Sequence, residues 1–245
     1  KNIHDINSKT LIVHWPGEGA EDNKTCDAAL LKNNKQAFDK LDLILAWGKF
    51  GKSQFELIFG KKANSKVQIT GNPRLDLVKF SQKKINSNSI GLIGRFNSLN
   101  HATGKSTLFS LRNGNLSNYK SIVSQLDGFM LMIEVCNFVL ENTNFNLSIR
   151  PHPLESVKRY KNDVLKFKNS KKMNIDENPN LSEWLFTQAC SVTPLSSSFL
   201  EHYLLKIPMI CTDRITENIS YIKSIQPNTA IATKLAILPK TKEEL

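Results

Sequence analysis

Several features that define common protein classes are missing from this sequence of 245 residues. No run approaches 18 consecutive apolar residues, and the longest candidate, Gly128 to Leu140, contains Glu134 and Asn137, so we expect no transmembrane helix. There is no Cys-x-x-Cys pair and no histidine spacing typical of metal ligands, so we expect no metal site. The sequence starts at Lys1 without an initiator Met or a signal-peptide core, which reads as the interior of a longer chain.

Arginine is also scarce, although the sequence is strongly basic. The net charge is +11, and 27 of the 33 basic residues are lysines spread along the whole chain. No basic helix with interleaved aromatic residues is present, so we expect no nucleic-acid partner and favour a small anionic ligand such as a nucleotide. The four cysteines are widely scattered and read as free thiols, which fits a reducing cytoplasm.

Short apolar β-type runs alternate with helical patterns, which is typical of α/β proteins with a parallel sheet and helices on both faces. The expected strands are 11–13, 43–46, 66–70, 90–94, 146–149, 189–193 and 208–211, and the expected helices are 122–140, 154–167, 181–187 and 196–205. A polar stretch at 81–89 reads as a linker. We therefore predict two Rossmann-like domains, 1–83 and 84–245.

One candidate binding segment follows the strand at 146–149. Arg150 and His152 come at the carboxyl end of that strand and are stiffened by two prolines. In open α/β sheets the ligand crevice lies at this edge, where His152 and Arg150 could donate to phosphate oxygens. The alternative is a loop histidine with a structural role.

A second candidate segment follows the strand at 189–193. Ser196, Ser197 and Ser198 open a helix, and hydroxyl and backbone N–H groups at such a point can bind phosphate. Glu201 lies one turn further on and could accept hydrogen bonds from ribose hydroxyls. The alternative is ordinary helix N-capping by serine.

Two further segments offer carboxylates and turn residues. Glu18 stands between two glycines on an exposed turn, where it could act as a general base, or the segment could be a plain turn. In Gly71-Asn72-Pro73-Arg74-Leu75-Asp76 the Gly-Asn-Pro run is turn chemistry. Asn72, Arg74 and Asp76 therefore indicate a hinge at a cleft more than a catalytic group.

Taken together, these motifs resemble a known group of proteins. The strings that carry the likeness are Trp47-Gly48, residues 70–77, residues 149–155 and residues 196–210. They resemble the bacterial surface carbohydrate biosynthesis proteins of capsule and lipopolysaccharide clusters, whose relatives include retaining β-Kdo transferases. The Glu-Gly, His-Pro and Ser-Ser elements are also similar to those of sialyltransferases that use CMP-sugars. The resemblance covers about residues 11 to 212.

The resemblance implies a GT-B architecture, in which two Rossmann-like domains face each other across a cleft, here with an incomplete N-terminal domain. It implies an enzyme that transfers a sugar, Kdo or a related 2-keto sugar acid, from a CMP-sugar to a glycan or lipid-linked glycan acceptor. His152 and Ser196 to Ser198 would hold the CMP phosphate, and Glu18 would face the sugar. No cofactor or metal is implied. The protein would work in the cytoplasm, including peripheral association with the inner face of the membrane.

Two other interpretations stay open. A CDP-glycerol glycerophosphotransferase of the teichoic acid type carries similar Arg-x-His-Pro and Ser-Ser elements, and His14 would be its nearby candidate for a catalytic histidine. A non-catalytic nucleotide-sugar-binding module is the third interpretation.

Overall fold

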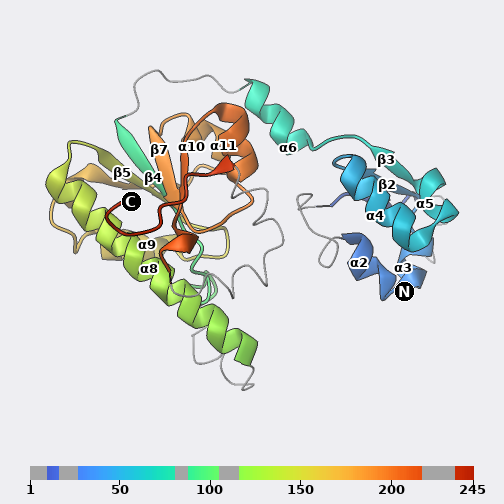
Figure 1. Ribbon diagram of the computed structural model, residues 1–245, viewed down its shortest axis with the longest axis horizontal. Coiled ribbons are helices and arrows are strands. Elements are labelled where there is room, and N and C mark those ends of the chain that lie inside the picture. Colours follow the sequence, from blue (N-terminus) through green and yellow to red (C-terminus); the bar gives the residue numbers. More distant parts are fainter. Residues whose placement is uncertain (1–9, 17–26, 81–87, 105–115, 217–234) are drawn as a thin grey trace. The chain divides into compact units, whose positions relative to one another are not determined.

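The structure, a computed structural model, describes residues 10–16, 27–80, 88–104, 116–216 and 235–245 (Figure 1). The chain divides into two compact units, Lys1–Asp76 and Leu77–Leu245, called here the N-terminal and the C-terminal unit. Each unit contains a parallel β-sheet with helical crossovers, as the alternating sequence pattern predicts. Most of the predicted linker, residues 81–87, lies outside the described residues.

The N-terminal unit has a three-stranded parallel sheet in the order β1-β2-β3. Its elements are β1 (Val13–His14), α2 (Asp27–Lys32), α3 (Lys35–Asp39), β2 (Leu43–Ala46), α4 (Lys49–Phe59), α5 (Lys61–Lys66), β3 (Val67–Ile69) and α6 (Pro73–Asp76). Alternate strand residues such as Ile44 and Val67 are fully buried against these helices. Phe38 and Phe59 stack with their ring centroids 3.7 Å apart and complete this core.

The C-terminal unit has a five-stranded parallel sheet in the order β6-β5-β4-β7-β8. Its elements are η1 (Leu77–Phe80), β4 (Ser89–Ile93), α8 (Leu116–Asn142), β5 (Asn146–Arg150), α9 (Val157–Val164), η2 (Ser170–Lys172), β6 (Met173–Ile175), α10 (Leu181–Leu185), β7 (Cys190–Thr193), α11 (Phe199–Leu205), β8 (Met209–Cys211) and η3 (Thr212–Arg214). In this doubly wound sheet the strand order reverses between β4 and β7, although all strands are parallel. Such sheets have their ligand crevice at this point, at the carboxyl edge.

Helices cover both faces of this sheet (Figure 1). On one face, α8 and α9 pack on β5 and its neighbours through residues such as Cys136, Leu147 and Tyr160. On the other face, Trp184 and Leu185 of α10 and Leu205 of α11 form a second cluster. Both faces of a parallel sheet need such cover because its strands are apolar on both sides.

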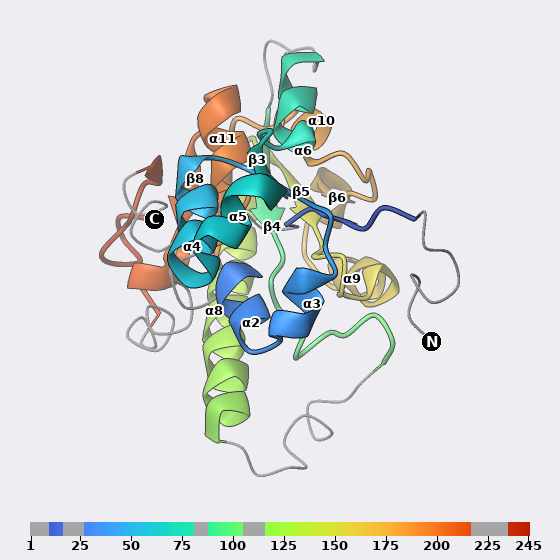
Figure 2. The same cartoon turned by 90° about the vertical axis from the view of Figure 1, so that its right-hand side faces the viewer.

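Helix α8 departs from the sequence expectation about membrane-spanning segments. Its segment Tyr119–Asn142 is long and apolar enough to cross a membrane. Within this segment, a window of 18 residues has a mean hydropathy of 1.4, and 33% of that window is buried inside the protein. The helix meets this test by length and composition only, because the mean hydropathy averages over scattered polar residues such as Glu134. The carboxyl half of α8 packs on the sheet, and the amino half extends beyond it (Figure 2).

The boundary between the units lies at Asp76/Leu77, seven residues before the predicted boundary at 83/84. The segment η1 belongs to the C-terminal unit because it contacts α11 and because Val78 packs against the cluster around Trp184. A domain boundary that is predicted from the polarity of neighbouring residues cannot take such an apolar contact into account.

Candidate functional site

The carboxyl edge of the C-terminal sheet gathers the loops that follow β4, β5 and β7. The loop after β5, residues 151–156, is called here the His152 loop, and the loop after β7, residues 194–198, is called the serine loop. Because β4 pairs with β5 on one side and with β7 on the other, these two loops flank the loop that starts at Gly94. Each loop was expected at the carboxyl end of a strand, and the parallel strand order brings both loops to one sheet edge. The roles assigned to the individual residues stay predictions.

Glu155 is the buried centre of this edge. The side chain is 3% exposed, and its carboxylate accepts hydrogen bonds from the backbone N–H groups of Phe96 and His152 and from the Tyr160 hydroxyl. Burial raises the pKa of Glu155, and the three donors oppose that rise. One carboxylate therefore joins the loop after β4 to the loop after β5.

His152 is half-buried and held in a defined orientation. Its Nδ1 accepts a hydrogen bond from the Leu154 N–H at 3.1 Å. A neutral imidazole that accepts at Nδ1 carries its proton on Nε2. The ring is thus set to donate from Nε2, as binding to a phosphate oxygen would require.

Arg150 makes structural contacts that the sequence did not reveal. Its guanidinium forms an ion pair with Asp176, donates to the Pro179 carbonyl at 3.3 Å and lies 5.6 Å from the Trp184 ring centroid. Burial lowers the pKa of Arg150, and the Asp176 charge opposes this. A phosphate would have to compete with these partners.

The serine loop also folds on itself. Ser196 Oγ accepts from the Ser198 N–H at 3.3 Å, as in a serine turn. Ser198 is 4% exposed, and its hydroxyl has no hydrogen-bond partner among the described residues. Helix α11, which follows this loop, has seven residues. Ser197 is half-buried, and Glu201 is 1% exposed, which leaves its carboxylate covered.

A second network, which sequence reasoning missed, crosses the point between β4 and β7. Arg95 donates to the Leu195 carbonyl, while the Leu195 N–H and the Cys211 thiol donate to Asp213. Burial raises the pKa of Asp213, opposed by these donors and by the charge of Arg95. The available signal was positional, because the loop after the first strand of a Rossmann-like unit borders the ligand crevice.

The N-terminal unit places the turn residues at the carboxyl edge of its own sheet. Gly71 has a φ of 79°, and Asn72 accepts from the Arg74 N–H at 3.0 Å, so this turn starts α6. Asn72 is 6% exposed, and its Nδ2 has no hydrogen-bond partner in the described part of the chain. Arg74 and Asp76 are exposed. Glu18, the predicted catalytic residue, lies outside the described residues.

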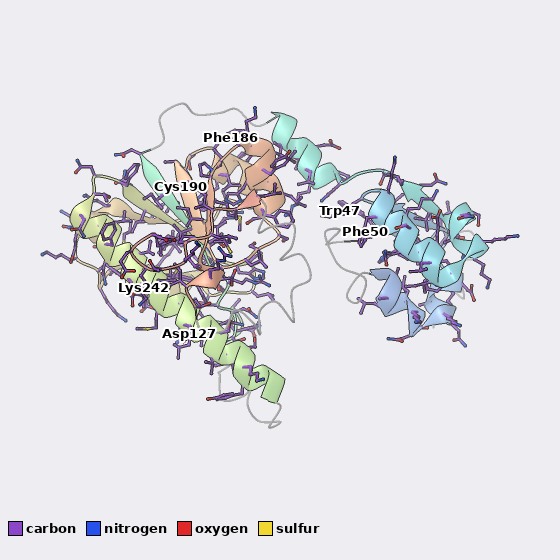
Figure 3. All side chains as sticks on the ribbon, in the orientation of Figure 1. Trp47, Phe50, Asp127, Phe186, Cys190 and Lys242 are labelled. Atoms are coloured by element: carbon purple, nitrogen blue, oxygen red, sulfur yellow. The ribbon has the colours of Figure 1, made fainter. Side chains whose placement is uncertain are left out.

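Nearby, the loops after β1 and β2 are tied together. Trp47 donates from its indole nitrogen to the Pro16 carbonyl at 2.9 Å, and Phe50, in the first turn of α4, is 49% exposed (Figure 3). Within the described ranges, no group of three or more His, Cys, Asp or Glu side chains could hold a metal ion.

Comparisons with known proteins give matches among solved structures. No protein-family model matches the chain, and no curated protein matches it. The S. aureus MnaA–UDP complex matches with 14% identity and a TM-score of 0.53, over 99% of this chain and 60% of that one. The UDP-GlcNAc 2-epimerase from Methanocaldococcus jannaschii matches with 18% identity and a TM-score of 0.51, over 97% and 62%. The wall teichoic acid polymerase TagF matches with 14% identity and a TM-score of 0.45, over 97% and 61%.

These likenesses show the fold. Two Rossmann-like α/β units of the GT-B type, the predicted fold class, are confirmed by the parallel sheets and by the matched structures. The chain spans about 60% of the length of the proteins it matches (60% and 62%).

Proposed function

We propose that the C-terminal unit binds the nucleotide of an activated sugar at the carboxyl edge of its sheet, and that the protein is a transferase of surface polysaccharide synthesis. The observation that carries this is the placement of the His152 loop and the serine loop on either side of β4. The S. aureus protein of the same fold is in complex with UDP, which supports a nucleotide ligand. A net charge of +11 favours an anionic ligand as well.

For the finer assignment we propose a CMP-sugar donor, Kdo or a related 2-keto sugar acid, and a glycan or lipid-linked acceptor. The support is the motif resemblance, above all the strings at 70–77 and 149–155. Cytoplasmic activity at the inner face of the membrane belongs to the same proposal. No cofactor or metal takes part in it.

A panel of nucleotides tests the donor. We expect CMP to raise the melting temperature of the protein, while UDP and GDP have smaller effects. At a hundredfold excess over the dissociation constant, linkage stabilises the native state by about 2.7 kcal/mol. Stabilisation by UDP alone would refute the cytidine donor and keep the nucleotide site. Stabilisation by CDP-glycerol above CMP would favour the glycerophosphotransferase, and no response to any nucleotide would refute the site.

Two substitutions at His152 separate phosphate binding from loop structure. In His152→Asn the amide oxygen can still accept from the Leu154 N–H, but the Nε2 donor is lost. We expect His152→Asn and His152→Ala to weaken nucleotide binding equally, by about 1.5–3 kcal/mol. Wild-type affinity of His152→Asn in calorimetry would mean that the ring only shapes the loop.

Glu18 carries the chemical step in this proposal, as a general base on the acceptor hydroxyl or as an orienting group. We expect Glu18→Gln to bind nucleotide normally and to lose about 10²–10⁴-fold in transfer rate in the full-length protein with its acceptor. Normal transfer would move the assignment to Glu21 or Asp22, the carboxylates that follow Glu18 in the sequence. Nucleotide binding without any transfer by the wild type would favour the non-catalytic module.

A further inference from the structure

A cavity in the C-terminal unit lies between α8 and α9 over β5 and reaches the loop after β4 at Leu99 and Asn100. Its volume is about 410 Å³, within the range of about 300–1,000 Å³ that is usual for ligand pockets. Phe129 and Ile133 of α8 line it together with Ile149 of β5. Arg150, His152 and Ser196 to Ser198 do not line this cavity, whereas Tyr160, which donates to Glu155 at the carboxyl edge, does.

The lining changes from apolar to charged along the cavity. Cys136 and Ile149, the most buried lining residues, are 1% and 2% exposed. Burial raises the pKa of the Cys136 thiol to about 12, so that thiol is neutral. At the exposed end stand Arg159 and the pair Lys166–Asp163, whose side chains are 2.7 Å apart and more than half exposed.

The surface around the opening is basic and unusually apolar. Residues 157–172 include seven basic side chains and one acidic side chain. Leu126 of α8, which lines the cavity, is 47% exposed, and Leu165, directly after α9, is 76% exposed. A buried apolar end and a basic, apolar mouth complement a molecule with a hydrocarbon chain and an anionic head.

We propose that this cavity binds a single-chain anionic amphiphile, with its hydrocarbon chain between α8 and α9 and its head group beside Arg159 and Lys166. The site stands on the cavity and its charges, and it does not depend on the proposed transferase activity. The same chemistry is offered by a free acyl or alkyl phosphate and by an anionic membrane lipid.

The first test is calorimetry of the full chain with alkyl phosphates from hexyl to dodecyl, below their critical micelle concentrations. We expect saturable binding of one molecule, with affinity rising about fourfold for each added methylene until the cavity is full. An alkyl maltoside of the same length should bind at least tenfold more weakly. No saturable binding of dodecyl phosphate would overturn the proposal.

Matched variants locate the site. Ile133→Trp fills the cavity and should lower the affinity for dodecyl phosphate at least tenfold, while Met130→Trp, on the same helix but outside the lining, should leave it unchanged. Arg159→Gln should lower the affinity about tenfold, and the exposed, non-lining Lys158→Gln should lower it less than twofold. Circular dichroism and melting temperature confirm that each variant is folded. Equal binding by wild type and Ile133→Trp would overturn the proposal.

Vesicles distinguish the two sources of the amphiphile. Displacement of dodecyl phosphate by phosphatidylglycerol vesicles, and not by phosphatidylcholine vesicles, would assign the cavity to a membrane lipid. If neither kind of vesicle displaces the bound dodecyl phosphate, the cavity is assigned to a free amphiphile. Either result supports the cavity as the site.

Discussion

Gly94 shows how a single residue allows the buried network at the sheet edge. A Cβ at this position would overlap Glu155 Oε2 and lie 3.1 Å from the Tyr160 hydroxyl. Because Glu155 is held by three donors, it cannot move away without losing hydrogen bonds. We expect Gly94→Ala to lower the free energy of unfolding by about 1–3 kcal/mol in urea denaturation.

The Gly94 prediction has an internal control. Truncation of the side chain in Glu155→Ala removes Oε2, the atom that a Cβ would overlap, and leaves only the contact with the Tyr160 hydroxyl at 3.1 Å. Gly94→Ala should therefore cost little more in the Glu155→Ala background, so that the two changes are not additive. Full additivity would mean that the clash is absorbed elsewhere.

His202 makes the C-terminal unit sensitive to acid. It is 2% exposed, its Nδ1 lies 2.7 Å from the Ser198 carbonyl oxygen, and its Nε2 contacts the Ser191 hydroxyl. Burial lowers the pKa of His202 from 6.5 to about 4. Between these pH values the unfolded chain binds more protons than the native one, so the free energy of unfolding falls as the pH falls, by about 3 kcal/mol over that window.

Urea denaturation between pH 7.5 and pH 4 tests this assignment. The difference in unfolding free energy between wild type and His202→Gln should shrink as the pH falls, because the variant has no ring to protonate. A difference that stays constant across the range would show that His202 is not the titrating group. The comparison cancels contributions from Glu155 and Asp213, which both proteins share.

At the scale of elements, the backbone conformation of each glycine in and after α4 decides whether replacing it by alanine raises or lowers the stability of the N-terminal unit. Gly51 lies inside this helix, and a Cβ there would meet Ala46 Cβ at an ordinary 3.6 Å. Gly60 ends the helix with a φ of 58°. We expect Gly51→Ala to stabilise the N-terminal unit by about 0.5–1 kcal/mol and Gly60→Ala to destabilise it by about 1–2 kcal/mol.

The matched pair is measured by denaturation followed through tryptophan fluorescence, in which Trp15 and Trp47 report on the N-terminal unit and Trp184 reports on the C-terminal unit. The two substitutions are chemically identical, so an equal effect of both would contradict the role given to φ. A destabilising Gly51→Ala would indicate that the start of α4 is not helical.

The elements that sequence reasoning predicted are those with a strong local pattern. The strand at 43–46 was predicted with its observed bounds, and the helix at 122–140 lies within α8. The helices α2 to α5 and the strand β6 were not predicted. Except for α4, they have six residues or fewer, and they depend on contacts such as the stacking of Phe38 on Phe59.

At the scale of the whole molecule, the observed boundary predicts how the C-terminal unit should be cut. A fragment that starts at Leu77 keeps Val78 packed on the cluster around Trp184, and a fragment that starts at residue 84 loses it. We expect fragment 77–245 to be about 1 kcal/mol more stable than fragment 84–245. Thermal unfolding of the two fragments measures this, and equal melting temperatures would place the boundary after residue 83.

The C-terminal segment adds a contact from another part of the sequence. Lys242 forms an ion pair with Glu134 of α8 at 2.7 Å, and Leu245 packs against the core cluster on the same face of the sheet (Figure 3). The ion pair is exposed and contributes little to stability. The segment is held by the apolar contact of Leu245 and by the backbone hydrogen bonds of Ile237 with Met209 and Cys211 of β8.

The sequence by itself determined the parallel α/β class, the turn at Gly71-Asn72-Pro73 and the two loops with His152 and the serines. These follow from periodicities and turn preferences that act over a few residues. Only the tertiary structure decided that β4 lies between β5 and β7, that Arg150 pairs with Asp176, and that Glu155 reaches the Phe96 N–H, 59 residues away. Such pairings depend on which strands meet, and a local pattern carries no information about strand order.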